Sequence, residues 1–528
     1  MTGANEAAAE PLANNASGRP AAVELIGVDK WFGPVHANDD VSLRVAAGAI
    51  HGIVGENGAG KSTLMSILYG YYQADAGEVR VAGQTVDIRR PHDAIAAGIG
   101  MVHQHFMLVD TFTVLENVML GVEGGPTLGA GRDKARDALE RLEREYKLEV
   151  DPDAIVANLP VGRQQRVEIL KALYRGAETL ILDEPTGVLT PQEADHLFRI
   201  LRALRVEGKT VILITHKLRE ILDVTDTVTV MRRGRVVANL PTSQTSKEAL
   251  AELMVGRKVL LRVDKAPARV GAPVLEVARL QVDDATGVRR VKEASFAVRA
   301  GEIVGIAGVS GNGQSELLEA LAGIRAIAGG RIVWKGRDIT ERFAQRTAAG
   351  MRKLGMGHVP EDRQRMGLIT AFAANESAIL GYHDDPAYNG PILMDRRAII
   401  DACAAMMSDY DVRPPDPLLP CHAFSGGNQQ KIVVAREMNR NPDLLLIGQP
   451  TRGVDIGAIE FIHKRIVALR DAGKAILLVS VELDEILSLA DRIIVMFDGR
   501  IVGEIAAAAA DERSLGLMMA GIPAEAAA

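Results

Sequence analysis

Short apolar runs alternate with helical patterns along most of the chain. Runs such as Thr210–Thr215 and Ile476–Val479 are rich in Ile, Leu and Val, which predicts buried strands of a parallel sheet. The segments between them, such as Pro191–Val206, carry helical patterns. This alternation predicts an α/β fold with a mainly parallel sheet. No run approaches the ~20 apolar residues needed to cross a bilayer, so we expect no membrane span.

The chain also repeats itself. Ala49–Gly55 matches Glu302–Gly308 at an offset of 253 positions, and Gly162–Arg166 matches Gly427–Lys431 at an offset of 265. A repeat of this length indicates a duplicated domain. We therefore predict two tandem domains at residues 22–256 and 274–522, a linker at 257–273, and disordered tails at 1–21 and 523–528.

Composition narrows the class of protein. The formal charge of −7 and the aromatic content of 4% argue against nucleic-acid binding, which favours basic surfaces and stacking platforms. Cys403 and Cys421 are the only cysteines, too few for a disulfide framework or a four-thiolate zinc site. This count fits a reducing cytoplasm. The amino-terminal segment lacks a basic region followed by an apolar one, so it does not read as a signal peptide.

A phosphate-binding loop is the first chemical motif. Gly55–Thr63 (GENGAGKST) follows the apolar strand His51–Val54 and precedes a predicted helix at Leu64–Leu68. In that context, glycines let backbone N–H groups converge on phosphate, Lys61 reaches the β- and γ-phosphates, and Ser62 ligates Mg²⁺. The predicted nucleotide-binding residues of this loop are Gly55, Asn57, Gly58, Gly60, Lys61, Ser62 and Thr63.

Two further strands end in polar side chains. Leu180–Glu184 (LILDE) ends in paired carboxylates, of which Asp183 would hold Mg²⁺ and Glu184 would polarise the attacking water. Ile212–His216 (ILITH) places His216 where it could sense the γ-phosphate. A lone histidine after a strand is more often structural, but the other motifs of this half favour the catalytic interpretation of His216.

These motifs, in this order, resemble the ATPases of ABC transporters. The tandem duplication with a short linker is similar to the fused ATPase subunits of bacterial sugar and nucleoside importers. Val161–Leu173 and Gly357–Gly367 look most like the nucleoside branch. The resemblance implies ATP and Mg²⁺ as cofactors. It also implies two ABC-type P-loop domains, each with a mainly parallel core sheet, an antiparallel β part and a helical signature subdomain.

The resemblance assigns two more residues of the first half. Gln104 would lie in a loop linking nucleotide to the membrane subunits, as a catalytic residue and metal ligand. Phe32 would stack on adenine, with Trp31 as a rival. A buried core aromatic is the structural alternative.

The second half lacks much of this chemistry. Its loop Gly308–Ser315 keeps Gly308, Gly313 and Ser315, but Gln314 stands in place of Lys61, and a neutral amide cannot offset phosphate charge. Other site positions are also altered. Gly448 replaces Asp183, Gln449 replaces Glu184, Val481 replaces His216, Glu361 sits near the Gln104 position, and Asp284-Ala285 replace Trp31-Phe32.

The signature loops show the reverse pattern. The second half carries Ser425, Gly426 and Gly427, whose hydroxyl and amides can donate to γ-phosphate at a helix start. The first half has Pro160 and Val161 there, and Thr190 stands opposite Asp455. The family resemblance implies that each ATP is sandwiched between one half's P-loop and the other's signature. Crosswise pairing then predicts one complete site and one degenerate site.

The resulting hypothesis is an ATP-hydrolysing subunit of an importer for nucleosides, with simple sugars as runner-up. The resemblance implies two separate membrane permease subunits and an extracytoplasmic solute-binding protein as partners, and no nucleic acid. It places the chain peripherally on the cytoplasmic face of the bacterial cell membrane. The rival is a soluble twin-ABC translation factor acting on ribosomes, which would need a long basic linker and two intact sites. Glu361–Arg363 is either a permease contact or a solvated loop.

Overall fold

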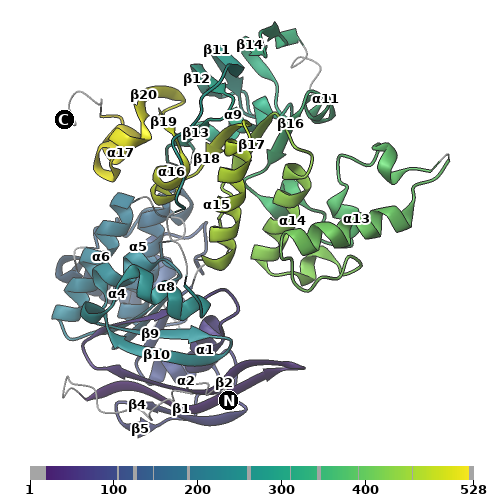
Figure 1. Ribbon diagram of the computed structural model, residues 1–528. Coiled ribbons are helices and arrows are strands. Elements are labelled where there is room, and N and C mark those ends of the chain that lie inside the picture. Colours follow the sequence, from purple (N-terminus) through teal and green to yellow (C-terminus); the bar gives the residue numbers. More distant parts are fainter. Residues whose placement is uncertain are drawn as a thin grey trace, which may run out of the picture. The chain divides into compact units, whose positions relative to one another are not determined.

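The computed structural model describes residues 20–522 except 104–105, 123–127, 147, 187–188, 190, 259–262, 310, 342–346, 391 and 455. The chain divides into two compact units, residues 1–258 and 259–528, both drawn in Figure 1. Each unit is described by itself. Residues 1–19 and 523–528, which make up nearly all of the two predicted tails, lie outside the described residues.

The first unit contains two sheets. The strands of its antiparallel sheet are β1 (Ala21–Phe32), β2 (Val35–Ala46), β4 (Ala76–Val81) and β5 (Gln84–Thr85). The strands of its larger sheet are β3 (Ile50–Val54), β6 (Ile99–Val102), β7 (Thr179–Asp183), β8 (Thr210–Ile214), β9 (Thr227–Arg232) and β10 (Arg235–Pro241). The larger sheet has the order β10-β9-β3-β8-β7-β6. All its neighbouring strands are parallel except β10, which is antiparallel to β9.

The helices of the first unit are α1 (Lys61–Leu68), α2 (Pro91–Ala96), α3 (Val114–Met119), α4 (Leu128–Tyr146), α5 (Val161–Tyr174), α6 (Pro191–Val206), α7 (Leu218–Val224) and α8 (Lys247–Val255). Single 3₁₀ turns are η1 (Val156–Asn158) and η2 (Thr242–Gln244). Helices α3, α4 and α5 pack on one another. They form the helical subdomain of this unit.

The second unit repeats these sheets strand for strand. Its antiparallel sheet contains β11 (Pro273–Asp283), β12 (Arg289–Arg299), β14 (Ile327–Trp334) and β15 (Arg337–Asp338). Its larger sheet contains β13 (Ile303–Ala307), β16 (Met356–Val359), β17 (Leu444–Gly448), β18 (Ala475–Val479), β19 (Arg492–Phe497) and β20 (Arg500–Ala506). The orders β12-β11-β14-β15 and β16-β17-β18-β13-β19-β20 match those of the first unit. The predicted fold class, two tandem α/β domains with mainly parallel core sheets, is confirmed.

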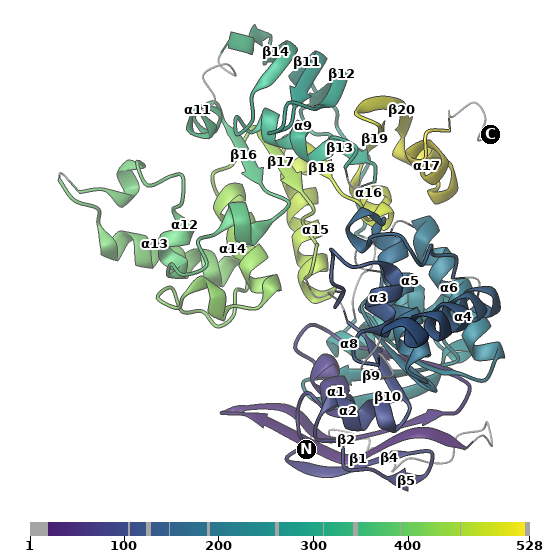
Figure 2. The ribbon, with the colours of Figure 1, turned by 180° about the vertical axis from the view of Figure 1, so that it is seen from behind.

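The helices of the second unit are α9 (Gln314–Leu321), α11 (Ala348–Lys353), α12 (Ala374–Ala378), α13 (Arg396–Asp409), α14 (Gly426–Met438), α15 (Ile456–Asp471), α16 (Leu483–Leu489) and α17 (Glu512–Met519). Short helical turns are η3 (Arg363–Gly367), η4 (Pro386–Tyr388), η5 (Cys421–Ala423) and η6 (Ala507–Ala509). Figure 2 shows α12, α13 and α14 as a lobe of this unit beside its sheets.

The central strands explain the apolar runs of the sequence. Every residue of β3, β8, β13, β17 and β18 is buried, as is typical of the central strands of a mainly parallel sheet that is covered on both faces. The predicted helix at Pro191–Val206 is α6, with the same bounds. Among the described residues, no helix is both long enough and apolar enough to span a bilayer.

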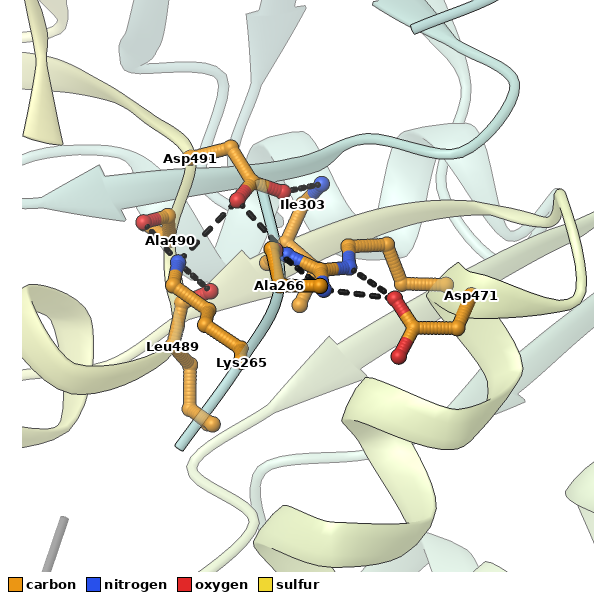
Figure 3. Close-up of polar contacts among 8 residues, drawn as sticks. Lys265, Ala266, Ile303, Asp471, Leu489, Ala490 and Asp491 are labelled. Carbon is orange, nitrogen blue, oxygen red and sulfur yellow. Dashed lines mark hydrogen bonds and ion pairs between the residues drawn. The ribbon is translucent and has the colours of Figure 1, made fainter. Parts of the chain in front are cut away.

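The segment that precedes β11 contacts the second unit through Lys265 and Ala266 (Figure 3). The Lys265 ammonium donates to the carbonyls of Leu489 and Ala490 at the end of α16, at 2.8 and 2.5 Å, and lies 3.1 Å from Asp491 Oδ1. A cation at the carboxyl end of a helix satisfies carbonyls that lack helical partners.

A buried arginine completes this anchor. Arg470 Nη1 lies 2.9 Å from Asp491 Oδ1, and Arg470 Nη2 donates to the Ala266 carbonyl at 2.9 Å. The Arg470 side chain is 0% exposed. In the first unit the matching pair is Arg205 and Asp226, 2.7 Å apart, and the Arg205 side chain is 37% exposed. The linker segment therefore contacts the Arg470–Asp491 ion pair, which is more deeply buried than the Arg205–Asp226 pair of the first unit.

Candidate functional site

The loop between β3 and α1 has the backbone of a phosphate nest. Gly58 and Gly60 have φ of +81° and +93°, values that side chains other than hydrogen disfavour. A Cβ on Gly60 would lie 2.4 Å from the Ala37 carbonyl oxygen, and one on Gly55 would lie 2.4 Å from that of Met231. Glycine is therefore required at Gly55 and Gly60 for steric reasons, and the loop can turn its N–H groups toward an anion.

Lys61 is buried at the start of α1. Its ammonium donates to the carbonyl oxygens of Gly55 at 2.7 Å and of Glu56 at 3.0 Å. Burial lowers the pKa of Lys61, while the negative charges of Glu184 and Asp183 oppose that shift. The ammonium thus lies over the nest, with carboxylates nearby that favour its charged form.

Asp183 and Ser62 face one another at the end of β7. Their side chains are hydrogen-bonded, and burial raises the pKa of Asp183, followed by the charge of Glu184, while the bond with Ser62 opposes the rise. A carboxylate and a hydroxyl are the oxygen donors that Mg²⁺ takes beside phosphates. The residues present therefore fit the predicted metal, and Asp183 and Ser62 would be two of its protein ligands.

Glu184 and His216 are brought together by strand pairing. Asp183 of β7 pairs with Ile214 of β8, so both strands end at the same edge of the sheet. Glu184 adopts φ +46°, and its carboxylate Oε1 lies 2.9 Å from His216 Nδ1. This hydrogen bond holds the pKa of Glu184 below its usual range. The carboxylate is therefore kept ionised and oriented, as a group that polarises water must be.

Several predicted residues cannot be placed in this geometry. Gln104, Thr190 and Asp455 lie outside the described residues. Phe32 and Trp31 are 41% and 49% exposed, so neither is a buried core aromatic. The Trp31 ring stacks on His36 with centroids 3.6 Å apart, and Phe32 meets the edge of Tyr72 at 5.1 Å. Which of the two stacks on adenine stays a prediction.

Sequence reasoning missed the buried polar groups that hold the loop after β7. Gln165 Nε2, on α5, donates to the Pro185 carbonyl at 2.7 Å. The Thr186 hydroxyl donates to the buried Glu220 carboxylate on α7. Nothing in the local pattern signals these bonds, because they join residues far apart in sequence. They fix the segment that directly follows Glu184.

The second unit keeps the nest but changes the side chains. Gly311 and Gly313 have φ of +91° and +94°, close to the values of their counterparts. Gln314 is buried at the start of α9, and its amide Nε2 donates to the Val309 carbonyl at 3.3 Å. Val309 is the counterpart of Glu56, so Gln314 repeats one contact of Lys61 without its charge.

The ends of β17 and β18 repeat the backbone of their counterparts. Gln449 adopts φ +47°, and its Oε1 accepts a hydrogen bond from the Val481 backbone N at 3.3 Å. In the first unit the same positions hold a carboxylate and an imidazole. Gly448, the counterpart of Asp183, ends β17 without a side chain.

Glu361 and Arg363 have partners within this unit. The Ser315 hydroxyl donates to Glu361 Oε2 at 2.6 Å. Arg363 Nη1 donates to the Arg452 carbonyl at 2.7 Å, and a Cβ on Gly426 would lie 2.6 Å from Arg363 Nη2. Glu361 and Arg363 are half-buried and Asp362 is exposed. Whether Glu361–Arg363 is a permease contact or a solvated loop stays a prediction.

The two signature loops start their helices differently. Ser425 caps α14, and its hydroxyl accepts hydrogen bonds from the Asn428 backbone N at 3.5 Å and the Asn428 side chain at 2.9 Å. Pro160 precedes α5 without a side-chain cap, and Val161 is 40% exposed. A serine hydroxyl at a helix start is a ready anion donor, whereas proline offers neither hydroxyl nor N–H.

Comparison with known proteins identifies the family. The model of the family described as ABC transporter matches residues 38–187 and 291–452, once in each unit. The chain therefore belongs to the ABC transporter family, as an ATP-binding protein with two ABC domains.

Curated relatives align over almost the whole chain. The chain is 47% identical to the guanosine import ATP-binding protein NupO of Bacillus subtilis (strain 168), over 94% of this chain and 97% of that protein. It is 46% identical to the nucleoside import ATP-binding protein NupA of Lactococcus lactis subsp. cremoris (strain MG1363), over 94% and 98%.

More distant matches were also found. The glucose import ATP-binding protein TsgD13 of Haloferax volcanii is 42% identical, over 94% of this chain and 96% of that protein. Among solved structures, the ATP-binding cassette MJ1267 of an ABC transporter is 26% identical with a TM-score of 0.41, over 45% of this chain and 98% of that chain.

Proposed function

We propose that the chain is the ATP-hydrolysing subunit of a nucleoside importer. The supporting observation is the order of identities, 47% and 46% to the guanosine and nucleoside import proteins against 42% to the glucose import protein. Relatives named for ribose and galactose import are 39% identical or less. Simple sugars are the runner-up substrates.

Hydrolysis belongs to one composite site in this proposal. It joins Lys61, Ser62, Asp183, Glu184 and His216 of the first unit with Ser425, Gly427 and Asp455 of the second. The pairing is supported by where the substitutions fall. The altered P-loop of the second half and the altered signature loop of the first half would both belong to the other ATP site. Independent decay would have scattered them over both.

The described geometry suggests what each first-unit residue does. The Gly-rich nest and Lys61 hold the phosphates, and Lys61 offsets the charge that develops during phosphoryl transfer. Asp183 and Ser62 would hold Mg²⁺, which neutralises phosphate charge when bound. Glu184, kept ionised by His216, accepts a hydrogen bond from the attacking water and orients it.

The other site would be degenerate. Gln314 supplies no charge, Gln449 cannot act as a base, and Val481 offers only its backbone where His216 offers an imidazole. Pro160 and Val161 would face that site from the first unit. We infer that this site does not hydrolyse ATP.

Separate proteins complete the transporter in this proposal. Two membrane permease subunits would carry the solute, and an extracytoplasmic binding protein would deliver it. The chain would then act peripherally at the cytoplasmic face of the membrane. ATP-driven closure of the two domains and reopening after hydrolysis would drive the permeases.

An uptake experiment tests the substrate and the class together. Membrane vesicles that contain the chain together with its permease subunits should accumulate radiolabelled guanosine or uridine when ATP is supplied. Ribose and galactose should compete poorly; strong sugar uptake would replace the nucleoside assignment by the runner-up. Co-purification with ribosomes, without permeases, would instead favour the translation-factor alternative.

A further inference from the structure

The helical lobe of the second unit has a longer connection than its counterpart in the first unit. Helix α12 ends at Ala378 and α13 begins at Arg396, so residues 379–395 join them. In the first unit, α3 ends at Met119 and α4 begins at Leu128, so residues 120–127 join them. In Figure 1 and Figure 2 the connection between α12 and α13 runs out beyond the helices of its lobe. The second unit therefore carries a projecting loop.

This loop exposes three consecutive large apolar side chains, which we call the apolar tip. Ile392, Leu393 and Met394 are 91%, 78% and 43% exposed. Single exposed apolar residues such as Val206, at 79%, are ordinary on protein surfaces. A contiguous group is different, because exposed apolar patches commonly mark interaction sites. The apolar tip is therefore a candidate contact surface.

The base of the loop is held by polar and ring contacts. The Arg440 guanidinium lies over the rings of Tyr382 and Tyr388, with 4.5 and 5.2 Å to their centroids. It also pairs with Asp385, and its Nη2 donates to the Tyr388 hydroxyl at 2.8 Å. The Asp395 backbone N donates to the Tyr388 carbonyl at 2.8 Å. The tip is thus left in water by a loop whose base is well packed.

The charges beside the tip are unequally engaged. Asp384 lies 3.4 Å from a lysine ammonium of α11. Asp395 accepts hydrogen bonds at 3.0 Å from backbone N–H groups at the start of α13. Arg396 and Arg397 come directly after it and are exposed. The Arg397 side chain is 93% exposed and lies 4.0 Å from Asp401. The two guanidinium groups are therefore open to an anionic partner.

We propose that the apolar tip inserts into the headgroup boundary of an anionic lipid bilayer, with Arg396 and Arg397 against the lipid phosphates. Apolar side chains beside cations are what lipid surfaces attract. Protein interfaces instead concentrate their binding energy on Trp, Tyr and Arg, and Leu is under-represented there. A projecting loop also needs no matching pocket in a fluid bilayer.

This contact goes beyond the proposed function, because it requires no permease. It draws on that function only for the place of the chain at the membrane. Insertion should be weak and reversible, since even a single myristoyl chain gives only marginal membrane binding. The tip would therefore orient the second unit against the bilayer, while other subunits hold the chain there.

The test is sedimentation of the purified full chain, without permeases, with vesicles of phosphatidylethanolamine and phosphatidylglycerol. A fraction of the chain should sediment with the vesicles, and Ile392→Asp/Leu393→Asp should lower the partition coefficient by about tenfold or more. Both side chains are exposed, so this variant should keep the Tm and the ATP turnover of the parent. Val206→Asp is the matched control and should sediment like the parent chain.

A second variant tests the headgroup contact. Arg396→Gln/Arg397→Gln should lower binding to the anionic vesicles by about tenfold, because each cation near an anionic surface adds to the attraction. The same variant should bind phosphatidylcholine vesicles as weakly as the parent chain does. Equal binding of parent and variant to anionic vesicles would contradict the headgroup contact.

Several results would overturn the inference. One is a parent chain that does not sediment with vesicles, and another is normal sedimentation of Ile392→Asp/Leu393→Asp. If that variant loses the permeases on co-purification while the parent chain binds no vesicles, the tip is a protein contact. If it dissociates a dimer of the parent chain, the tip belongs to an interface between two copies. Failure of the importer proposal would appear separately, in the uptake experiment.

Discussion

The residues that follow β7 and β17 have the same backbone conformation but chemically different side chains. Glu184 and Gln449 adopt φ of +46° and +47°, and their backbone N–H groups donate to Ile214 and Val479 carbonyls at 2.9 and 2.8 Å. Yet the first side chain contacts an imidazole and the second contacts a backbone N–H. A left-handed conformation is uncommon for residues other than glycine. Its presence in both units shows that the backbone conformation of this position is kept although the side chain differs.

This comparison separates two requirements that usually coincide. Strand pairing and loop geometry depend on backbone hydrogen bonds, which glutamine and glutamate satisfy equally. In the proposed function, catalysis depends on an ionised group at this position, and of these two residues only Glu184 carries a carboxylate.

The largest effect is expected from Glu184→Gln. The substitution makes the first strand end chemically equal to the second, so ATP turnover should fall by about 10³-fold while ATP stays bound. Phosphate release by the full chain at saturating ATP measures this. Gln449→Glu is the mirror variant and should not add turnover; substantial release by Glu184→Gln would mean that the second unit hydrolyses ATP.

His216→Ala should lower the rate of ATP turnover about a hundredfold, because Glu184 loses the hydrogen bond that orients its carboxylate. The His216 hydrogen bond lowers the pKa of Glu184, so its removal raises that pKa. The carboxylate is then protonated at higher pH, and the acidic limb of the pH–rate profile should move upward. Rates measured across pH test this. Val481→Ala is the matched control, and an unshifted profile for His216→Ala would contradict the assignment.

A third contrast concerns stability. Arg470→Met removes a fully buried guanidinium that pairs with the half-buried Asp491 and donates to the Ala266 carbonyl, so the free energy of unfolding should fall by about 2 kcal/mol. Arg205→Met removes the counterpart, whose side chain is 37% exposed, and should cost about 1 kcal/mol or less. Thermal unfolding of the full chain compares them. Equal losses would show that the linker segment does not strengthen the second pair.

The smallest effect is expected from Gln314→Lys. The variant restores the charge of the P-loop lysine, but Gly448, Gln449 and Val481 still lack the side chains to which the proposed function assigns metal binding and water activation. Steady-state ATP turnover should therefore stay unchanged. A clear gain would show that the missing ammonium alone silences the second unit.

Much of this architecture was predictable from the sequence. Buried parallel strands leave continuous Ile, Leu and Val runs, so the duplicated α/β fold and α6 could be located directly. The P-loop could be recognised from the spacing of its glycines, because steric limits within the loop determine where glycine is needed. His216 and Glu184 could each be assigned to the candidate site because both follow strand-like runs, but their mutual hydrogen bond was not predicted.

Other features depend on contacts that no local pattern encodes. The partner of Ser315 lies 46 positions away, and its change from Asp183 to Glu361 involves two strand ends at once. Aligned motifs identify Gly448 as a loss, but they do not show that another carboxylate fills its place. The bonds of Thr186 and Gln165 were missed for the same reason.

The fastening of Lys265 bears on where the second unit can be cut from the chain. A fragment beginning at residue 274 would discard both the ammonium that meets the end of α16 and the Ala266 carbonyl that accepts from Arg470. The Arg470 guanidinium would then face solvent on one side. The fragment should therefore be less soluble and less stable than one beginning at Val263. Expression trials of isolated second domains should therefore start upstream of the anchor.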